Sequence, residues 1–222
     1  MISVAIDGPA GAGKSTLSRK VAAELGFIYV DTGALYRAVG LKFIDKGANT
    51  ELNVDIDSIL AETKVDIRFC EGEQRVFLDG EDVSDKIRTP EVSMMASAVS
   101  AKPAVRAYLL EMQRKLAREN NVIMDGRDIG TVVLPNATVK IFLTASAEDR
   151  SRRRYEELIL KNQNVTYKEV YDDMVKRDYN DSHRDIAPLK PAEDSVIADT
   201  TGFEFQESLE LLLSIIREKA EI

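Results

Sequence analysis

Short apolar runs alternate with amphipathic stretches along most of the chain. Each apolar run has the length of a buried strand, and the sequence after it repeats apolar residues at helical spacing. In the first unit, Leu17, Val21, Ala22 and Leu25 recur on one face of a helix expected over residues 14–25. Strands that alternate with helices form a parallel sheet covered by helices, so the pattern predicts an α/β fold. The expected strands are residues 2–6, 27–30, 122–124, 139–143 and 195–198.

One segment interrupts this alternation with a period of two. Residues 65–69 and 76–79 alternate apolar and polar positions on either side of Glu71-Gly72-Glu73, which predicts a β-hairpin within an inserted segment. Beyond it, Pro90 and Pro103 each begin a helical stretch, at the first turn, where a missing N–H is tolerated. The remaining helical stretches are expected at about residues 34–46, 90–100, 103–119, 145–181 and up to about 220.

Length and composition favour one ordinary globular domain over residues 1–222. Cys70 is the only cysteine and His183 the only histidine, which excludes a disulfide within the chain and a typical structural zinc site. No export signal or membrane span is evident, so we expect a cytoplasmic protein without a membrane partner. The net charge of −8 argues against general nucleic-acid binding. An anionic ligand would therefore need arginines placed locally around it.

A glycine-rich motif lies between the first expected strand and helix. It fits the P-loop pattern, in which backbone N–H groups and the positive end of a helix hold phosphate. Lys14 would reach the β- and γ-phosphates, the Ser15 hydroxyl would bind magnesium, and Thr16 would add a phosphate contact. The predicted ATP-binding residues are Gly8, Pro9, Ala10, Gly11, Ala12, Gly13, Lys14, Ser15 and Thr16.

Asp125 ends the apolar run of residues 122–124. That position is typical of a Walker B aspartate, which helps to hold magnesium through water. A plain cap at the end of a strand is the alternative. We expect Asp125 to share the metal site with Ser15.

Two other motifs suggest different classes of protein. Asp31-Thr32-Gly33 matches the catalytic loop of aspartic proteases, but a second copy is missing and the sequence that follows is helical. Residues 63–66 and 199–202 resemble GTPase motifs, yet they occur in the wrong order for a GTPase switch. A homodimeric protease and a regulatory nucleotide-binding module remain minor alternatives.

Arginine-containing clusters indicate a second anionic substrate. They include Tyr36-Arg37, Arg88 with Arg106, residues 125–128, and the helical stretch from Arg150 to Arg184. Such a charge run is ordinarily a solvated helix face, but beside a P-loop it favours contact with phosphate. In that stretch Arg150, Arg153 and Arg154 can point in one direction at helical spacing.

At these positions the chain resembles bacterial cytidylate kinases, from residue 2 to the last helix. The similarity is carried by Asp31–Arg37, by Gly80–Ser84 with Ile87–Thr89, by Asp125–Val133 and by Arg184–Leu189. The resemblance implies a P-loop kinase with a central parallel sheet, an acceptor-binding insertion at about residues 60–100 and a helical lid at about 150–165. It also implies transfer of the γ-phosphoryl group of ATP to CMP or dCMP with magnesium, by an enzyme that we expect to be monomeric.

Elementary chemistry agrees with that reaction. A phosphate monoester has a second pKa near ~6, so the attacking group is largely a dianion at pH 7 and needs no general base. Alignment and neutralisation of charge then suffice, and His183 is expected at the surface or in the lid. Closure of the lid would bring Arg150, Arg153 and Arg154 onto the transferring group.

The resemblance also assigns the acceptor site. Arg37 and Arg127 would hold the acceptor phosphate, since a planar guanidinium matches two phosphate oxygens. Ser97, Arg106 and Asp128 would surround cytosine, whose N4 amino group donates to a carboxylate where uracil presents a carbonyl. Asp181 and Arg184 would contact the sugar, with Thr32 and Tyr36 nearby. The complete predicted CMP-binding set is Thr32, Tyr36, Arg37, Arg88, Ser97, Arg106, Arg127, Asp128, Asp181 and Arg184, and the catalytic set is Lys14, Arg127, Arg150, Arg153 and Arg154.

Some questions stay open at the level of sequence. The family often has glycine where Ser15 stands, so the hydroxyl on magnesium could come from Ser15, from Thr16 or from water. A kinase for UMP, AMP or a hydroxyl compound is the alternative enzyme, although Asp128 with Arg106 argues against it. No motif identifies the groups that contact adenine.

Overall fold

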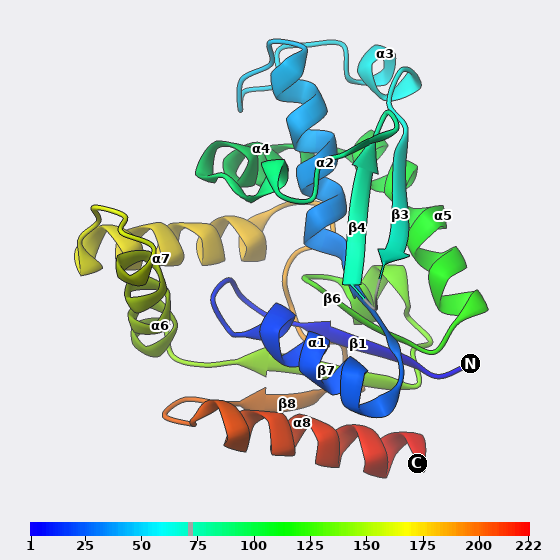
Figure 1. The fold of residues 1–222 in the computed structure, drawn as a ribbon, viewed down its shortest axis with the longest axis vertical. Coiled ribbons are helices and arrows are strands. Elements are labelled where there is room, and N and C mark those ends of the chain that lie inside the picture. Colours follow the sequence, from blue (N-terminus) through cyan, green and yellow to red (C-terminus); the bar gives the residue numbers. More distant parts are fainter. Residues whose placement is uncertain (71–72) are drawn as a thin grey trace.

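The computed structural model describes residues 1–70 and 73–222 and has the expected α/β architecture (Figure 1). A five-stranded sheet runs in the order β2-β6-β1-β7-β8, with every neighbouring pair parallel. The strands are β1 (Ser3–Asp7), β2 (Ile28–Asp31), β6 (Val122–Gly126), β7 (Val139–Thr144) and β8 (Val196–Asp199). The prediction of a parallel sheet from strand–helix alternation is therefore confirmed.

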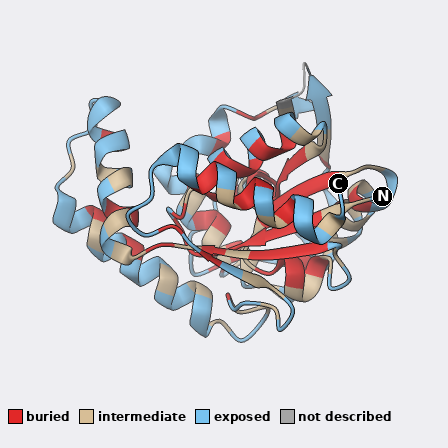
Figure 2. Ribbon diagram, turned by 90° about the horizontal axis from the view of Figure 1, so that it is seen from below, coloured by how far each residue is buried: buried red, intermediate tan, exposed pale blue. Residues whose placement is uncertain are grey.

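Helices cover both faces of this sheet. α1 (Lys14–Leu25) and α8 (Phe205–Ala220) cover one face, where Val4 and Ile6 of β1 point into their apolar cluster. Ala5 points to the other face, toward a cluster that includes Ala117 of α5 (Pro103–Glu119). Alternation of side chains along a strand explains this division. Figure 2 shows the buried strands between more exposed helices.

The inserted segment forms a second apolar unit. It contains α3 (Ile56–Ala61), an antiparallel sheet of β3 (Val65–Cys70), β4 (Glu73–Leu78) and β5 (Glu81–Asp82), and α4 (Pro90–Ser100). This unit packs on α2 (Thr32–Asp45), and the whole cluster is built around side chains such as Phe43, Leu35 and Ile87. The predicted hairpin is present with a third short strand, and residues 71–72 of its expected turn lie outside the described residues.

Three local features differ from the predicted pattern. α2 begins at Thr32, before the expected start at about residue 34, because the Asp31 carboxylate accepts from Ala34 N and caps the helix directly. The long helix expected over 145–181 is two helices, α6 (Ala147–Leu160) and α7 (Tyr167–His183), separated at Asn162 by a left-handed residue and restarted by a capping box at Thr166. Residues 129–133 form a π-helical turn that no pattern predicted.

α6 and α7 together form an arm that projects from the carboxyl ends of the strands (Figure 1). In the part of the chain that the structure describes, no helix is both long and apolar enough to cross a bilayer.

Candidate active site

The carboxyl ends of β1, β2 and β6 meet at one edge of the sheet and open into a cavity of about 740 Å³. In parallel α/β sheets this edge is where ligands bind. The cavity extends from the glycine-rich loop to α4, and it also touches the arm and the start of α8. Every residue of the predicted acceptor set lines it, as do Ala10 to Thr16 of the loop.

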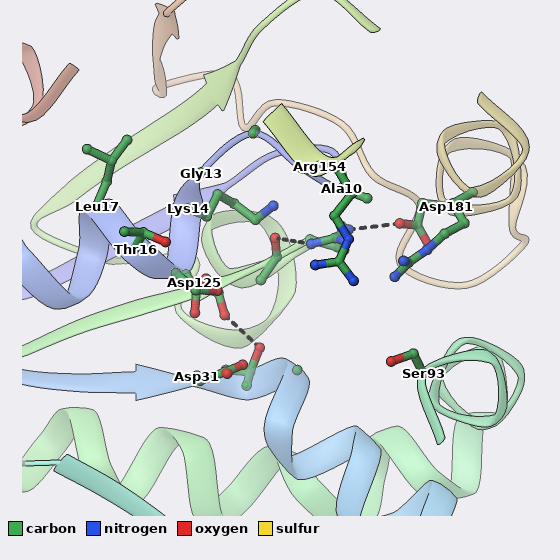
Figure 3. Close-up of a pocket in the computed structure, with 18 of the residues that line it drawn as sticks. Ala10, Gly13, Lys14, Thr16, Leu17, Asp31, Ser93, Asp125, Arg154 and Asp181 are labelled. Atoms are coloured by element: carbon green, nitrogen blue, oxygen red, sulfur yellow. Dashed lines mark hydrogen bonds and ion pairs between the residues drawn. The ribbon is translucent and has the colours of Figure 1, made fainter. Parts of the chain in front are cut away.

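The glycine-rich loop connects β1 to α1 in a conformation that depends on its glycines. Gly13 caps α1 with a φ of 81°, and a Cβ at Gly8 would overlap the Leu143 carbonyl of β7. Lys14 is buried, and it lies beside Gly13 and Asp125 in Figure 3. Its Nζ donates to Pro9 O at 2.6 Å across the loop. Burial, followed by the charge of Arg127, lowers the pKa of Lys14 well below its ordinary value. Gly8 and Pro9 lie behind the loop and do not line the cavity.

Beside the loop, two carboxylates end neighbouring strands. Asp31 of β2 and Asp125 of β6 are partners in the parallel register, and both are buried. Ser15 Oγ donates to Asp125 Oδ2 at 2.9 Å, and the Tyr29 hydroxyl donates to Oδ1 at 3.1 Å. Burial raises the pKa of Asp125 to about 6, and the charge of Asp31 contributes in the same direction. A cation between these groups would relieve that repulsion.

The side chains beside the glycine-rich loop are oxygen donors. No cluster of three or more histidine, cysteine or acidic side chains able to hold a metal occurs within the described ranges. Two carboxylates and the Ser15 hydroxyl are hard oxygen donors, and Mg²⁺ usually combines one or two carboxylates with water and substrate phosphate. The residues present therefore fit a magnesium ion that arrives with a nucleotide.

Arginines converge on the other end of the cavity. Arg37 and Arg88 approach Asp31 Oδ2 at 3.7 and 3.4 Å, and Arg127 Nε donates to Asp181 Oδ2 at 2.8 Å. Arg37 NH1 is buried without a hydrogen-bond partner in the described residues. The same nitrogen lies 3.7 Å from Asp31 Oδ2, beyond hydrogen-bond distance, so its N–H groups can donate to a bound anion.

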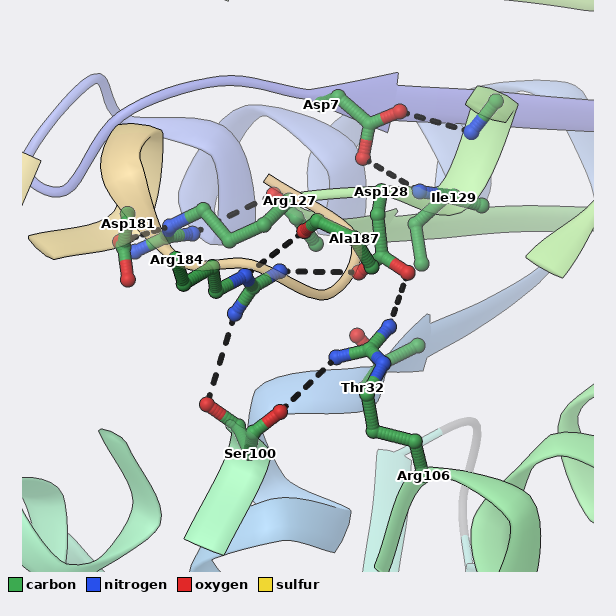
Figure 4. A network of polar contacts seen from close by, with 12 residues as sticks. Asp7, Thr32, Ser100, Arg106, Arg127, Asp128, Ile129, Asp181, Arg184 and Ala187 are labelled. Carbon is green, nitrogen blue, oxygen red and sulfur yellow. Dashed lines mark hydrogen bonds and ion pairs between the residues drawn. The ribbon is translucent and has the colours of Figure 1, made fainter. Parts of the chain in front are cut away.

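A polar network closes the same end (Figure 4). Asp128 is 3% exposed, and its two carboxylate oxygens meet Arg106 NH2 and, at 3.5 Å, Arg184 NH2. Burial raises the pKa of Asp128, while Arg106 and Arg184 lower it. Arg106 also donates to Ser100 O at 3.2 Å and lies over the ring of Tyr36.

Two further residues of the predicted acceptor set are Ser97 and Thr32. Ser97 of α4 lines the cavity. Thr32 also lines it, but its hydroxyl donates to Asp125 O at 2.7 Å and so ties α2 to β6.

The three arginines expected to act together do not share one place. Arg154 lines the cavity and bonds to Glu157 at 2.7 Å, while Arg153 lines it and donates to Thr200 O and Phe203 O. Arg150 does not line the cavity, because its guanidinium is buried against the root of the arm. Helical spacing predicts that the three arginines lie on one helix, but it does not predict which acceptor each guanidinium meets.

Several lining residues were not assigned to the predicted acceptor or catalytic sets, although Arg177 belongs to the arginine cluster expected between Arg150 and Arg184. Arg177 of α7 lies near Arg127, and the structure shows no ion pair for it within the described residues. Its helical spacing from Asp181, one turn away, was the available signal. Phe203, Phe205 and Ser208, at and just before the first turns of α8, also line the cavity, and no sequence motif marks them.

Asp7 was also missed, although it directly precedes the glycine-rich loop. Its buried carboxylate accepts from Ile129 N and Gly130 N at 2.7 Å each. It thereby fixes the π-helical turn that follows Arg127 and Asp128. Burial raises the pKa of Asp7 to about 6 even though these two N–H groups oppose the shift.

Comparison with known proteins identifies relatives along nearly the whole chain. The chain is 52% identical to the cytidylate kinase of Caldicellulosiruptor bescii over 96% of this chain and 95% of the relative, and 49% identical to that of Carboxydothermus hydrogenoformans over 99% of both. A solved structure of an uncharacterized protein from Eubacterium ventriosum shares the fold, with a TM-score of 0.54, 11% identity and coverage of 97% of this chain and 98% of that chain. The family model described as cytidylate kinase matches residues 4–218, and the chain belongs to the cytidylate kinase family.

Proposed function

We propose that the protein transfers the γ-phosphoryl group of ATP to CMP or dCMP, giving ADP and CDP or dCDP, in pyrimidine nucleotide metabolism. The observation that carries the proposal is one cavity with a phosphate-binding loop at one end and an arginine-lined end closed by Asp128 at the other. The membership of the cytidylate kinase family supports it. The bond from the γ-phosphorus to the bridging oxygen of ADP breaks, and a bond from an acceptor phosphate oxygen to the same phosphorus forms.

The donor end would bind the polyphosphate mainly through the backbone. N–H groups of the loop and of the first turn of α1 face the phosphates, with Lys14 as a point charge. Ser15, Asp125 and Asp31 would hold magnesium, which supplies charge neutralisation on the phosphate oxygens. Phe203, Phe205 and Ser208 line the same cavity and would contact the base of ATP.

The acceptor end would bind a phosphate dianion. Arg37, Arg88, Arg127 and Arg177 all line this part of the cavity and offer guanidinium forks to the phosphate oxygens. The dianion attacks without losing a proton, so no general base is required. His183 is not placed to act as a general base, because it is exposed and stacks on Tyr179 with ring centroids 4.0 Å apart.

Asp128 would select cytosine. Its carboxylate can accept from the N4 amino group, and Arg106 and Ser97 lie beside it to donate to O2 and N3. Uracil places a carbonyl at position 4, which would face the carboxylate without a hydrogen bond. Asp181 and Arg184 complete the acceptor site beside the sugar.

The arm would supply the last charges. Arg153 and Arg154 line the cavity from α6 and are positioned to reach the transferring group when the arm closes. Closure would also exclude water, the competing acceptor. We expect a monomeric cytoplasmic enzyme that acts on free nucleotides, without a nucleic-acid or membrane partner.

The test is release of ADP from ATP and magnesium with CMP, dCMP, UMP, AMP, GMP or no acceptor. We expect strong turnover with CMP and dCMP only, and a loss of at least 100-fold in Lys14→Met. Lys20→Met is the matched control, because Lys20 is exposed on the same helix and, among residues 1–70 and 73–222, pairs only with Glu24. Consumption of ATP that is independent of the nucleotide would contradict the proposal.

A further inference from the structure

Each nitrogen of the Arg150 guanidinium donates to a protein acceptor at the root of the arm. Nε donates to Ala145 O at 2.9 Å, NH1 to Ala10 O at 2.7 Å, and NH2 to Asp178 Oδ2 at 2.6 Å. The side chain is only 6% exposed. The three acceptors belong to the turn after β7, to the phosphate-binding loop and to α7. One side chain therefore joins three segments that are distant in sequence.

Its contact with Ala10 O has a consequence for the loop. The peptide unit between Ala10 and Gly11 is planar and trans, so its C=O and N–H point in opposite directions. When Arg150 holds the carbonyl from the outer side, the Gly11 N–H is turned toward the inner side. Gly11 has a φ of 73° and lines the cavity, and its N–H has no acceptor within residues 1–70 and 73–222.

Packing reinforces this arrangement from α7. A Cβ built on Gly11 would lie 2.7 Å from Met174 Cε and 3.3 Å from Arg150 Cβ. The top of the loop is thus enclosed between α6 and α7, without space for a side chain. Asp178 lies one turn of α7 beyond Met174 and fixes Arg150 by its charge.

We propose that Arg150, anchored by Asp178, is a positioning residue that orients the Ala10–Gly11 peptide so that the Gly11 N–H binds the phosphates of the donor nucleotide. In this arrangement Arg150 does not touch the transferring group. The phosphate-binding loop and the arm are coupled through it, so the donor site depends on α6 and α7. The proposal rests on the proposed function only in taking ATP and ADP as the donor and its product.

The test measures binding without turnover. Isothermal titration calorimetry would give the Kd of ADP with magnesium, and of tripolyphosphate, for wild type, Arg150→Met, Arg150→Lys and Asp178→Asn. We expect Arg150→Met to weaken both ligands about 10- to 100-fold, because a charged hydrogen bond that orients the peptide is lost. Arg150→Lys should recover part of the affinity, and Asp178→Asn should lose an intermediate amount. Arg152→Met is the matched control on the same helix, since that side chain is 64% exposed and its only ion pair in the described part of the chain is with Asp149.

CMP binding by the same variants separates positioning from a general structural role. We expect the Kd of CMP to change less than twofold and the circular dichroism spectrum to match that of wild type, whereas the urea midpoint of Arg150→Met should fall because a buried ion pair is broken. Arg150→Met with wild-type affinity for ADP but a kcat reduced 100-fold would overturn the proposal and place Arg150 on the transferring group. If Arg150→Met does not fold, Arg150→Lys and Asp178→Asn decide, and unchanged ADP binding in both would also overturn it. A wild-type protein that binds ADP but neither binds nor phosphorylates CMP would contradict the proposed function alone.

Discussion

Replacement of Asp128 by asparagine isolates the selection of the acceptor base. Asp128 follows β6 and is buried, and each carboxylate oxygen meets one guanidinium, from Arg106 or Arg184. A carboxylate offers about four acceptor positions, so two contacts leave room for the N4 amino group of cytosine. Asparagine keeps the shape and one oxygen for Arg106, but it lacks the charge and presents an N–H₂ group. It is therefore preferable to alanine, which would leave two guanidiniums without a partner.

The size of the effect follows from the bond that is lost. A hydrogen bond to a charged group contributes about 1.5–3 kcal/mol, which corresponds to about 10- to 150-fold in kcat/KM for CMP. UMP gains a donor opposite its O4 carbonyl, so its kcat/KM should rise. We expect the ratio of kcat/KM for CMP to that for UMP to fall by about 100-fold or more.

The measurement is kcat/KM for both nucleotides at saturating magnesium-ATP. Asp66→Asn is the matched control, because Asp66 is half exposed on β3 and its only ion pair within the described residues is with Arg68. An equal loss with CMP and UMP would refute base selection by Asp128. Its role would then be to hold Arg106 and Arg184 in place, whichever nucleotide is bound.

Three further variants test other parts of the site. Arg177→Ala should raise KM for CMP and lower kcat, each about 10-fold, because a charge in the acceptor end is lost. Steady-state kinetics would detect this change, with the exposed Lys176→Ala as the control. Unchanged kinetic constants would show that Arg177 is not part of the site. Burial raises the pKa of Asp7 from 3.8 to about 6, so its ionisation lowers the free energy of unfolding by up to about 3 kcal/mol as the pH rises from about 4 to about 6. Urea denaturation of Asp7→Asn should lose this part of the pH dependence, and an unaltered slope would disagree with the burial argument. Gly8→Ala should lower the free energy of unfolding by about 3 kcal/mol or more, because its Cβ would overlap Leu143 O. Gly47→Ala has open space around the new Cβ and should lower the free energy of unfolding by about 1 kcal/mol. Similar urea midpoints for the two variants would contradict this prediction.

The helices and strands were predictable wherever a local sequence signal fixes where an element begins or ends. Residues 14–25 combine helical spacing with a glycine on either side, and the observed α1 has these bounds. The prolines at 90 and 103 marked the beginning of α4 and α5 correctly. The break between α6 and α7 was missed because polar residues continue at helical spacing through it, and only the left-handed Asn162 and the capping box at Thr166 end one helix and start the next.

The site was predictable where a motif fixes backbone geometry. The glycine-rich loop and Asp125 come together because β1 and β6 are neighbours in the sheet, and the strand–loop–helix pattern already implied the loop. Asp7 could not be recognised in the same way, since its role depends on the N–H groups of residues 129 and 130. Nothing in the local sequence indicates that a π-helical turn will present those groups to it.

The arginines show why residue type and spacing do not determine a role. A guanidinium can bind a ligand only through the N–H groups that do not already donate to the protein. Arg150 has acceptors from three segments and serves the protein, whereas the structure shows no hydrogen bond or ion pair for Arg177 in the described residues, so its charge faces the cavity. Both lie on helices of the arm, and only the tertiary contacts separate them. Counting protein acceptors around each arginine therefore separates residues that shape the site from residues that bind phosphate. Arg150→Met should weaken ADP binding and leave CMP binding unchanged, whereas Arg177→Ala should raise KM for CMP, so the two variants test that division.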